Sequence, residues 1–265
     1  MHEVAGIIFA AGKGSRMIGY NGNKTLLPLV PGSSLYEGER PLLLEVLENL
    51  PAGPKGIVVN HCAEDVEKAT AGLGVHYLLQ PETNGTGGAL LAARPFLDSV
   101  SSPQALITMG DVPLIRPDTY QRLMEELARH DLALLAFVPR DKAQYGMLEM
   151  EGGRALRIVE WKYWKAYAPE RQTKLLYCNA GVYAAKRPLL LKYLDRLAGM
   201  PHHVRKQRGD EWVDIEEYFL TDLVEMMSGD GLSIGVVLAP EEEVMGVDTP
   251  EALEQAQRRY ATCRS

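Results

Sequence analysis

The most constraining feature of this sequence is its first stretch, Val4–Met17, which reads VAGIIFAAGKGSRM. An apolar run typical of a buried β-strand leads directly into a loop that holds Gly12, Lys13, Gly14 and Arg16. Glycines allow backbone N–H groups to approach phosphate oxygens closely, and the two cations neutralise phosphate charge. A strand that ends in such a loop indicates an α/β protein that binds a polyphosphate.

The spacing of this loop excludes the two common glycine-rich phosphate motifs. A P-loop requires G-x-x-x-x-G-K-[ST], whereas Lys13 is followed by Gly14 and no glycine lies five positions before Gly12. A dinucleotide-binding loop requires glycine or alanine at the position that Met17 holds here. A loop that only reverses the chain is the alternative, but two cations at the end of a buried strand favour phosphate binding.

The composition limits the classes of function. Of the 265 residues, 46% are hydrophobic and 24% are charged, which is typical of a globular protein with a sizeable core. The net charge of −7 argues against nucleic acid and anionic membranes as partners but leaves single nucleotides possible. Three scattered cysteines lack zinc-site spacing and the N-terminus lacks a signal peptide, so we expect a cytoplasmic protein. The sequence does not indicate an oligomeric state.

Apolar runs and helical patterns alternate along the first half of the chain. Continuous apolar strands separated by helices predict a mostly parallel sheet covered on both faces. Ligands of such sheets bind beyond the carboxyl ends of the strands, where the loops after Phe9 and Met109 both lie. The expected strands are Val4–Phe9, Gly56–Asn60, Ala105–Met109 and Leu132–Val138, and the expected helices are Arg40–Leu50, Glu64–Gly72, Thr86–Leu97 and Pro117–His130.

The second half of the chain is less regular and predicts a second lobe that faces the first across a cleft. We expect one domain over residues 1–265, with a nucleotide-binding lobe at 1–111 and the second lobe at 112–265. The basic segment 199–214 is expected to be an exposed loop. A hairpin is expected at Tyr145–Glu151 and Ala155–Glu160, strands at Leu175–Tyr183 and Leu232–Leu238, and helices at Arg187–Leu197, Glu217–Met227 and Pro250–Tyr260.

Two aspartates are candidate ligands of a divalent cation. Asp111 follows the third apolar strand through Gly110, which would place its carboxylate at the ligand-binding edge of the sheet. Asp248 also follows an apolar stretch, and Thr249 directly after it is the expected cap of the helix Pro250–Tyr260. A plain turn is the alternative for Asp111, and helix capping is the alternative for Asp248. The sequence leaves open whether the two carboxylates meet at one magnesium ion.

Other polar residues suit nucleotide or sugar recognition, and each has a structural alternative. The amide of Gln80 offers a donor and an acceptor to a nucleobase edge, but a loop before a helix equally explains the stretch QPETNGTGG. Lys24 and Lys162 could reach phosphate or be surface lysines. The residues suited to sugar hydroxyls and amides lie near the ends of second-half strands: Gly146, Glu160 and Asn179.

Taken together, these motifs resemble the sugar-1-phosphate nucleotidyltransferases, in the same order over almost the whole chain. The family's opening L-A-A-G-x-G-T-R-M is similar to Phe9–Met17, and its Q-x-E-x-x-G-T-G is similar to Gln80–Gly87. Its E-Y-Y-x-T-D and I-V-E-x-K-D patterns narrow the resemblance to the uridylyltransferase (pyrophosphorylase) domain of the bacterial N-acetylglucosamine-1-phosphate enzyme. The other similar stretches are Met109–Leu114 for Y-G-D-V-P-L, Tyr145–Leu148 for Y-G-R-I, Ile158–Tyr163 for I-V-E-x-K-D, Asn179–Gly181 for N-T-G, Glu217–Asp222 for E-Y-Y-x-T-D and Gly246–Thr249 for G-V-N-N.

The resemblance implies a Rossmann-like three-layer α/β/α sandwich with a mostly parallel mixed sheet. It implies Mg²⁺ as cofactor, with Asp111 and Asp248 as its ligands, and a nucleoside triphosphate and a sugar 1-phosphate as substrates. It assigns the catalytic cations and the nucleotide and sugar sites as follows. Lys13, Arg16 and Lys24 would act on the phosphates; Ala10, Ala11, Gly12, Gly14, Gln80, Gly85, Thr86 and Gly110 would bind the nucleotide; and Gly146, Glu160, Asn179 and Lys162 would bind the sugar in the second lobe.

The sequence departs from the family's pattern in several places. Asp248 replaces an asparagine, although its charge suits Mg²⁺ better. Trp161 and Tyr163 replace the residues that flank the sugar-side lysine, which leaves the identity of the sugar open. The stretch 31–41 resembles an insertion, and we do not expect the hexapeptide-repeat acetyltransferase half within these 265 residues.

The expected reaction is uridylyl transfer from UTP to N-acetylglucosamine 1-phosphate, which yields pyrophosphate and a UDP-sugar used as a cell-envelope precursor. The attacking phosphate is already ionised near neutral pH, so the reaction needs charge neutralisation rather than a general base. Two alternatives stay open. One keeps the chemistry with other substrates, such as glucose 1-phosphate, or CTP with a polyol or choline phosphate. The other is a regulator that binds a nucleotide sugar without catalysis.

Overall fold

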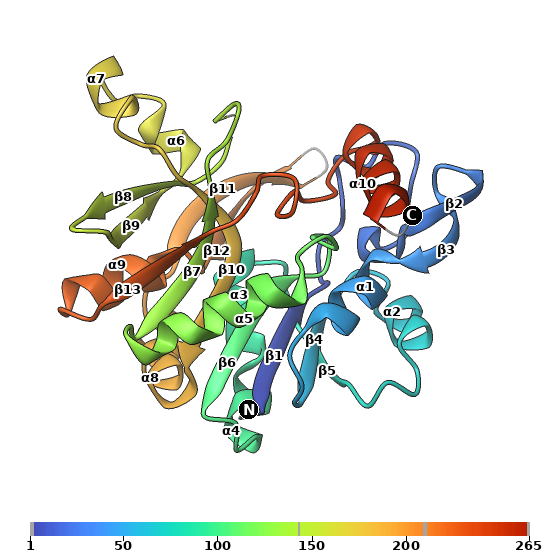
Figure 1. The fold of residues 1–265 in the computed structure, drawn as a ribbon, viewed down its shortest axis with the longest axis horizontal. Helices are drawn as coiled ribbons and strands as arrows, with labels where there is room; N and C mark the ends of the chain where they lie inside the picture. The colour runs from blue at the N-terminus through green and yellow to red at the C-terminus, as the bar shows by residue number, and fades with distance from the viewer. Residues whose placement is uncertain (1–2, 143, 209–210, 264–265) are drawn as a thin grey trace.

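A nine-stranded mixed sheet forms the centre of the protein (Figure 1). The computed structural model describes residues 3–142, 144–208 and 211–263. The main path of the sheet runs β13-β7-β10-β6-β1-β4-β5, and β10 lies antiparallel between β6 and β7 while the other neighbours on this path are parallel. The strands are β1 (Val4–Phe9), β4 (Lys55–Val59), β5 (His76–Leu79), β6 (Gln104–Met109), β7 (Leu132–Phe137), β10 (Cys178–Lys186) and β13 (Ile234–Leu238).

Helices cover both faces of the sheet, which confirms the predicted three-layer α/β/α sandwich. Alternate residues of β1 enter two separate cores: Ile7 lies in the core with α3, α4, α8 and α9, and Ile8 lies in the core with α1, α2 and α5. Both side chains are fully buried, as the period of two in a strand requires. The helices are α1 (Leu42–Asn49), α2 (Ala63–Ala69), α3 (Gly85–Ala92), α4 (Arg94–Ser99), α5 (Pro117–Glu125), α8 (Arg187–Ala198) and α9 (Asp222–Gly229).

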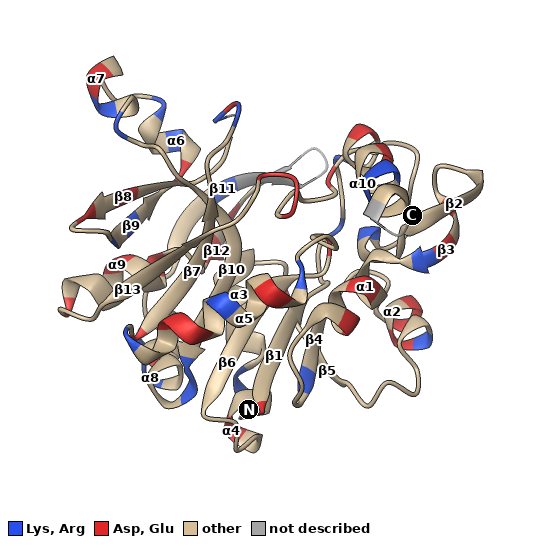
Figure 2. Cartoon of the chain, in the orientation of Figure 1, with Lys and Arg blue, Asp and Glu red and all other residues tan. Residues whose placement is uncertain are grey.

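Charged residues lie around this core rather than within it. Figure 2 shows the central strands largely free of charged residues, which lie mainly on the helices and loops. The continuous apolar strands of the sequence therefore correspond to a sheet that is buried on both faces. No helix among the described residues combines the length and apolar character that crossing a membrane requires.

The carboxyl ends of the parallel strands meet at one edge of the sheet, as predicted. Phe9 pairs with Met109, and Gly110 N donates to Phe9 O at 2.9 Å, so the loops after β1 and β6 leave the sheet side by side. The loop after β5 joins them, because Gln80 N donates to Val59 O at 2.9 Å. Since β10 runs in the opposite direction, it begins at this same edge.

Two smaller units flank the main sheet. A hairpin of β8 (Met147–Glu151) and β9 (Arg154–Val159) branches from β10 and is followed by α6 (Trp161–Trp164) and α7 (Pro169–Gln172). A hairpin of β2 (Pro28–Ser34) and β3 (Glu37–Pro41) includes the 31–41 stretch and packs against the C-terminal helix α10. α10 (Pro250–Cys263) begins with the predicted cap, since Ala252 N donates to Thr249 Oγ1 at 3.2 Å. The 3₁₀ helices are η1 (Lys24–Leu26) and η2 (Glu126–Ala128).

Three expectations about elements were wrong. The single helix expected over Thr86–Leu97 is split at Ala93 into α3 and α4, because Pro95 cannot donate its backbone N–H and restricts the residue before it. The segment 199–214 is not a loop: it contains β11 (His202–Arg208) and the start of β12 (Glu211–Glu217), which form an antiparallel ribbon. The helix expected from Glu217 begins at Asp222, because β12 extends to Glu217.

Candidate active site

The glycine-rich loop leaves β1 at the ligand-binding edge of the sheet. Ala10 and Ala11 are buried, whereas Gly12 and Lys13 are exposed. Gly14 has a φ of +60°, which glycine adopts without strain, and Met17 N donates to Gly14 O at 2.8 Å to close the turn. The loop therefore presents open backbone to solvent, as a phosphate-binding loop requires.

A cluster of four charged side chains lies beside this loop. The Lys24 ammonium contacts both the Asp111 carboxylate and the Asp248 carboxylate, and Arg16 Nη2 lies 2.8 Å from Asp248 Oδ2. The side chains of Lys24 and Asp111 are 16% and 14% exposed, while Arg16 is 68% exposed. The structure thus brings together four of the predicted site residues from three distant segments of the chain.

Backbone contacts hold the Asp111 and Asp248 carboxylates where both reach the Lys24 ammonium. Val247 N donates to Asp111 O at 2.8 Å, which joins the loop before Asp248 to the loop after β6. Lys24 reaches both carboxylates from η1, whose N-cap is Asn23. The cluster is therefore fixed by the fold and not only by attraction between its charges.

The charges in this cluster stabilise one another. Burial would lower the pKa of Lys24, but the neighbouring charges of Asp111 and Asp248 outweigh that effect and raise the pKa. Burial would likewise raise the pKa of Asp248, but Lys24 and Arg16 lower it. Lys24 is consequently an ammonium, and Asp248 a carboxylate, at neutral pH.

The two carboxylates have the chemistry of a magnesium site completed by substrate. Both contact one ammonium group, so oxygens of Asp111 and Asp248 can meet at a single small cation. Among the described residues, no group of three or more His, Cys, Asp and Glu side chains could hold a metal ion. Mg²⁺ is commonly held by one or two carboxylates together with substrate phosphates and water, and this donor set matches that pattern.

Asn23 is a residue that the sequence reasoning missed. Its side chain is buried, and its Nδ2 donates to Ala10 O at 2.7 Å and to His61 O at 2.9 Å. Its Oδ1 accepts from Thr25 N at 3.0 Å and from Thr25 Oγ1 at 2.8 Å. Asn23 thereby ties the glycine-rich loop to the helix that carries Lys24. The available signal was an asparagine immediately before a helical turn, where it acts as an N-cap.

On the nucleotide side, the structure places Gln80 against the start of α3. The Gln80 side chain is buried, and its Nε2 donates to Asn84 Oδ1 at 3.0 Å and to Gly85 O at 3.2 Å. Thr86 is exposed at the first turn of α3, and its Oγ1 accepts from Leu220 N at 3.2 Å. The amide donors of Gln80 are therefore used within the protein, which fixes the loop that precedes α3.

Three of the four residues predicted to bind the sugar lie together: Gly146, Glu160 and Asn179. Asn179 N donates to Gly146 O at 2.9 Å. A Cβ on Gly146 would lie 2.9 Å from Ile158 Cγ2 and 3.6 Å from both carboxylate oxygens of Glu160, so the backbone of Gly146 lies close to this carboxylate and only glycine fits there without displacing Ile158. The Asn179 side chain donates to Tyr183 Oη at 2.7 Å and accepts from Gly181 N at 3.0 Å. These contacts fix Asn179 beside Gly146.

Thr221 contacts the Glu160 carboxylate, and the charge of Lys162 acts on it. Thr221 Oγ1 donates to Glu160 Oε1 at 3.1 Å. The Lys162 ammonium lies 5.1 Å from the centre of the Phe219 ring and is exposed to solvent. Burial raises the pKa of Glu160, and the Thr221 hydrogen bond and the Lys162 charge only partly offset it.

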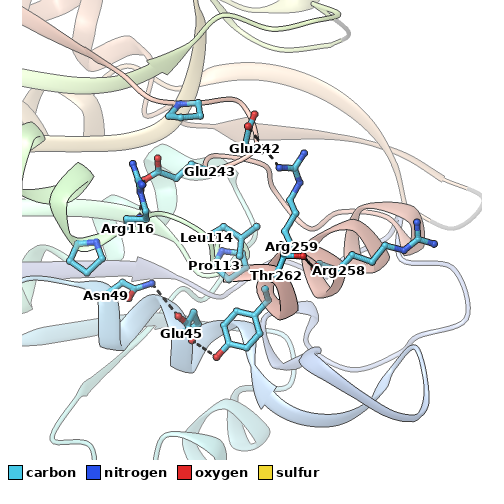
Figure 3. Close-up of a pocket in the computed structure, with 13 residues that line it drawn as sticks. Glu45, Asn49, Pro113, Leu114, Arg116, Glu242, Glu243, Arg258, Arg259 and Thr262 are labelled. Atoms are coloured by element: carbon cyan, nitrogen blue, oxygen red, sulfur yellow. Dashed lines mark hydrogen bonds and ion pairs between the residues drawn. The ribbon is translucent and has the colours of Figure 1, made fainter. Parts of the chain in front are cut away.

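A cavity of about 650 Å³ lies apart from this cluster, between α10, α1 and the loop after Asp111 (Figure 3). None of the predicted site residues lines it. Glu243 in its wall accepts hydrogen bonds from Arg116 N at 2.9 Å and from Thr119 Oγ1 at 2.6 Å, which caps α5. We therefore assign Glu243 a structural role and locate the candidate active site at the sheet edge.

Comparison with known proteins shows which family the chain resembles. The family model described as the MobA-like NTP transferase domain matches residues 6–209. The bifunctional protein GlmU of Cereibacter sphaeroides is 32% identical over 261 residues, which cover 96% of this chain and 51% of that protein. The chain thus spans about half the length of the curated relatives it matches.

Solved structures share the fold at low sequence identity. The uridine diphosphate N-acetylglucosamine pyrophosphorylase of Trypanosoma brucei superposes with a TM-score of 0.73 at 14% identity, covering 96% of this chain and 65% of that chain. A CMP:2-keto-3-deoxy-manno-octonic acid synthetase complexed with CTP gives a TM-score of 0.63 at 16% identity, covering 99% of each chain. Because the family model covers most of the sequence and the fold agrees, the chain belongs to the family of MobA-like NTP transferase domains.

Proposed function

We propose that this nucleotidyltransferase transfers a uridylyl group from UTP to a sugar 1-phosphate, with N-acetylglucosamine 1-phosphate as the preferred acceptor. The observation that carries the proposal is the ion-pair cluster of Arg16, Lys24, Asp111 and Asp248 beside an open glycine-rich loop. Two anionic substrates can react only where their charges are neutralised, and this cluster supplies two cations and two candidate metal ligands at one sheet edge.

The reaction joins two phosphates. An oxygen of the sugar phosphate attacks the α-phosphorus of UTP in line, the bond from that phosphorus to the β-phosphate oxygen breaks, and pyrophosphate leaves. The attacking phosphate carries its charge already, because the second pKa of a phosphate monoester is about 6. No side chain is therefore required as a general base.

The cations of the cluster lower the repulsion between the substrates. In the proposal, Lys13 and Arg16 hold the triphosphate over the exposed backbone of Gly12, and Lys24 contacts the reacting phosphates. Asp111 and Asp248 would hold Mg²⁺, which supplies further neutralisation of the phosphate oxygens when bound. The other members of the triphosphate and nucleotide site would be Ala10, Ala11, Gly14, Gln80, Gly85, Thr86 and Gly110.

The acceptor would occupy the space beside the Glu160 carboxylate. A glutamate carboxylate accepts hydrogen bonds from sugar hydroxyls and from an N-acetyl N–H, and the backbone of Gly146 lies beside this carboxylate. Asn179 and Lys162 complete the proposed sugar site in the lobe formed by residues 112–265, opposite the nucleotide lobe formed by residues 1–111. The GlmU relatives and the name of the Trypanosoma brucei structure support an amino-sugar acceptor.

A second candidate keeps the chemistry and changes the nucleotide. The specific observation is that a CMP-sugar synthetase with bound CTP superposes over 99% of both chains. In addition, Asp248 stands where the resembled family has asparagine. CTP with a polyol or choline phosphate is therefore the alternative substrate pair.

Pyrophosphate release tests both candidates. Purified protein is assayed with UTP, CTP, ATP or GTP against N-acetylglucosamine 1-phosphate, glucose 1-phosphate and choline phosphate, with Mg²⁺ and with EDTA. The highest kcat/KM is expected for UTP with N-acetylglucosamine 1-phosphate, and EDTA is expected to stop the release. A higher kcat/KM with CTP would favour the second candidate, and no release with any pair would overturn both.

A further inference from the structure

Residues 218–222, which we call the linking segment, join the two predicted substrate sites. The first part of the linking segment forms hydrogen bonds with the start of α3, which carries residues predicted to bind the nucleotide. Tyr218 N donates to Asn84 O at 2.9 Å, and Gly87 N donates to Tyr218 O at 2.8 Å. Leu220 N donates to Thr86 Oγ1 at 3.2 Å. This part of the segment is therefore held by backbone contacts to the nucleotide side.

The last two residues of the linking segment contact Glu160 and His202. The Thr221 hydroxyl donates to Glu160 Oε1 at 3.1 Å. The Asp222 carboxylate lies 2.7 Å from His202 Nε2, and the His202 ring packs 4.6 Å from the ring of Phe219. His202 lies in the first pair of the β11–β12 ribbon, so the ribbon anchors this end of the segment.

Thr221 is the hydrogen-bond partner that can fix the orientation of the Glu160 carboxylate. Among the described residues, its hydroxyl is the group that donates a hydrogen bond to the Glu160 carboxylate. The same carboxylate lies beside Gly146, at a position where an added Cβ would lie 3.6 Å from both of its oxygens. Without the hydroxyl, Glu160 would lose the contact that fixes its orientation beside Gly146.

We propose that Thr221 is a positioning residue that orients the Glu160 carboxylate toward the acceptor sugar, and that the His202–Asp222 pair holds Thr221 in place. This inference rests on the proposed function, because it takes the space beside Glu160 as the acceptor site. Thr221 acts through Glu160 and is not itself assigned a contact with substrate. Its removal should therefore affect the acceptor much more than the nucleotide.

The charges around Glu160 make its pKa a direct report of this contact. Burial raises the pKa of Glu160, the Thr221 hydrogen bond and the Lys162 charge lower it, and Asp222 raises it. The pKa of Asp222 is itself raised by burial and by Glu225, and lowered by His202 and Lys162. A variant that lacks only the hydroxyl should raise the pKa of Glu160 further, because a hydrogen bond to the charged form favours that form.

The test compares Thr221→Val, which removes the hydroxyl at nearly constant shape, with Thr221→Ser, which keeps it. For Thr221→Val we expect the KM for N-acetylglucosamine 1-phosphate to rise about tenfold, the typical loss for a hydrogen bond to a charged group. The KM for UTP should change less than about twofold, and Thr221→Ser should restore the acceptor KM. Thr173→Val, at an exposed threonine directly after α7, is the matched control.

A second readout does not depend on turnover. The pH titration of the Glu160 carboxyl ¹³C signal, assigned with Glu160→Gln, should shift to higher pH in Thr221→Val and return in Thr221→Ser. His202→Leu should produce a smaller rise in the acceptor KM, with no rise in the UTP KM.

The outcomes separate this inference from the proposed function. Unchanged acceptor KM and an unchanged Glu160 titration in Thr221→Val, with transfer intact, would overturn the positioning role alone. Equal losses for UTP and acceptor would also overturn it, since they would show that Thr221 only supports the fold. Wild-type protein that neither binds nor turns over the sugar phosphate would overturn the proposed function, while the titration would still decide whether Thr221 fixes Glu160.

Discussion

The Lys24 ammonium forms an ion pair with Asp248, a residue 224 positions later in the chain. The same ammonium contacts Asp111, and the backbone bond from Val247 N to Asp111 O holds the two loops together at 2.8 Å. Two carboxylates this close would repel each other if no cation lay between them. The cluster is therefore one electrostatic unit, in which the loss of any member changes the charge felt by the others.

Replacing Lys24 by methionine should remove most of the catalytic rate. The substitution keeps the length of the side chain but leaves Asp111 and Asp248 without their shared cation and the reacting phosphates without a positive partner. We expect kcat/KM to fall by about two to three orders of magnitude, the usual effect of losing one preorganised electrostatic contact. Pyrophosphate release at saturating Mg²⁺ measures the change, with Lys68→Met at a 75% exposed lysine as control. A Lys24→Met enzyme as fast as wild type would contradict the assigned role.

Replacing Asn23 by aspartate should destabilise the protein. The carboxylate would face the carbonyl oxygens of Ala10 and His61, to which the amide now donates. Replacing a buried amide donor with an unpaired carboxylate lowers the free energy of unfolding by roughly 3 kcal/mol. Urea unfolding followed by circular dichroism measures the loss. Asn21→Asp, at an exposed asparagine nearby, should change the stability by less than about 0.5 kcal/mol, and equal losses in both variants would contradict the scaffold role of Asn23.

The layers of the fold could be predicted from the sequence, because apolar strands and amphipathic helices carry a local pattern. β1 follows its apolar run residue for residue, and Thr249 caps α10 as expected. Short or charged elements carry no such pattern. β5 is an edge strand with mostly exposed side chains, and β11 is a run of polar residues paired only with β12, so neither resembles a buried strand. Their positions depend on pairing with distant or following strands.

The chemistry of the candidate site was visible in the sequence, but its connections were not. Asp111 and Asp248 could each be proposed from a strand end, whereas their meeting at Lys24 depends on the fold. Asn23 and Thr221 act through contacts with residues 13 and 61 positions away, respectively. Local sequence does not encode such contacts. Residues that position other side chains therefore cannot be identified by the residue type alone, unlike charged groups that act on substrate.

Replacing Gly85 by alanine should disturb the junction between α3 and the linking segment. Gly85 has a φ of +95°, and an added Cβ would lie 2.4 Å from Tyr218 O. Strain of this kind costs about 1–3 kcal/mol, and relief would require α3 to move away from residue 218. We expect lower thermal stability and a higher KM for UTP. Gly229→Ala is the matched control, because a Cβ there meets no atom within 4 Å and its φ is not positive. A harmless Gly85→Ala substitution would contradict the close contact.

The acceptor KM should depend on the protonation of Glu160. Burial raises the pKa of this carboxyl above the ordinary glutamate value of about 4.3, so its proton is taken up at a higher pH than that of a free glutamate. The carboxylate is the form that accepts hydrogen bonds from the sugar. As the pH falls through the raised pKa, that form is lost, and the KM for the sugar 1-phosphate should rise while the KM for UTP stays level. Glu160→Gln should have a high acceptor KM at every pH and lack the part of the acidic limb that Glu160 causes, while the part due to the sugar phosphate, whose second pKa is about 6, should remain. Initial rates measured from pH 5 to 8 check the prediction, and an acidic limb of the same midpoint in Glu160→Gln would assign the titration to another group.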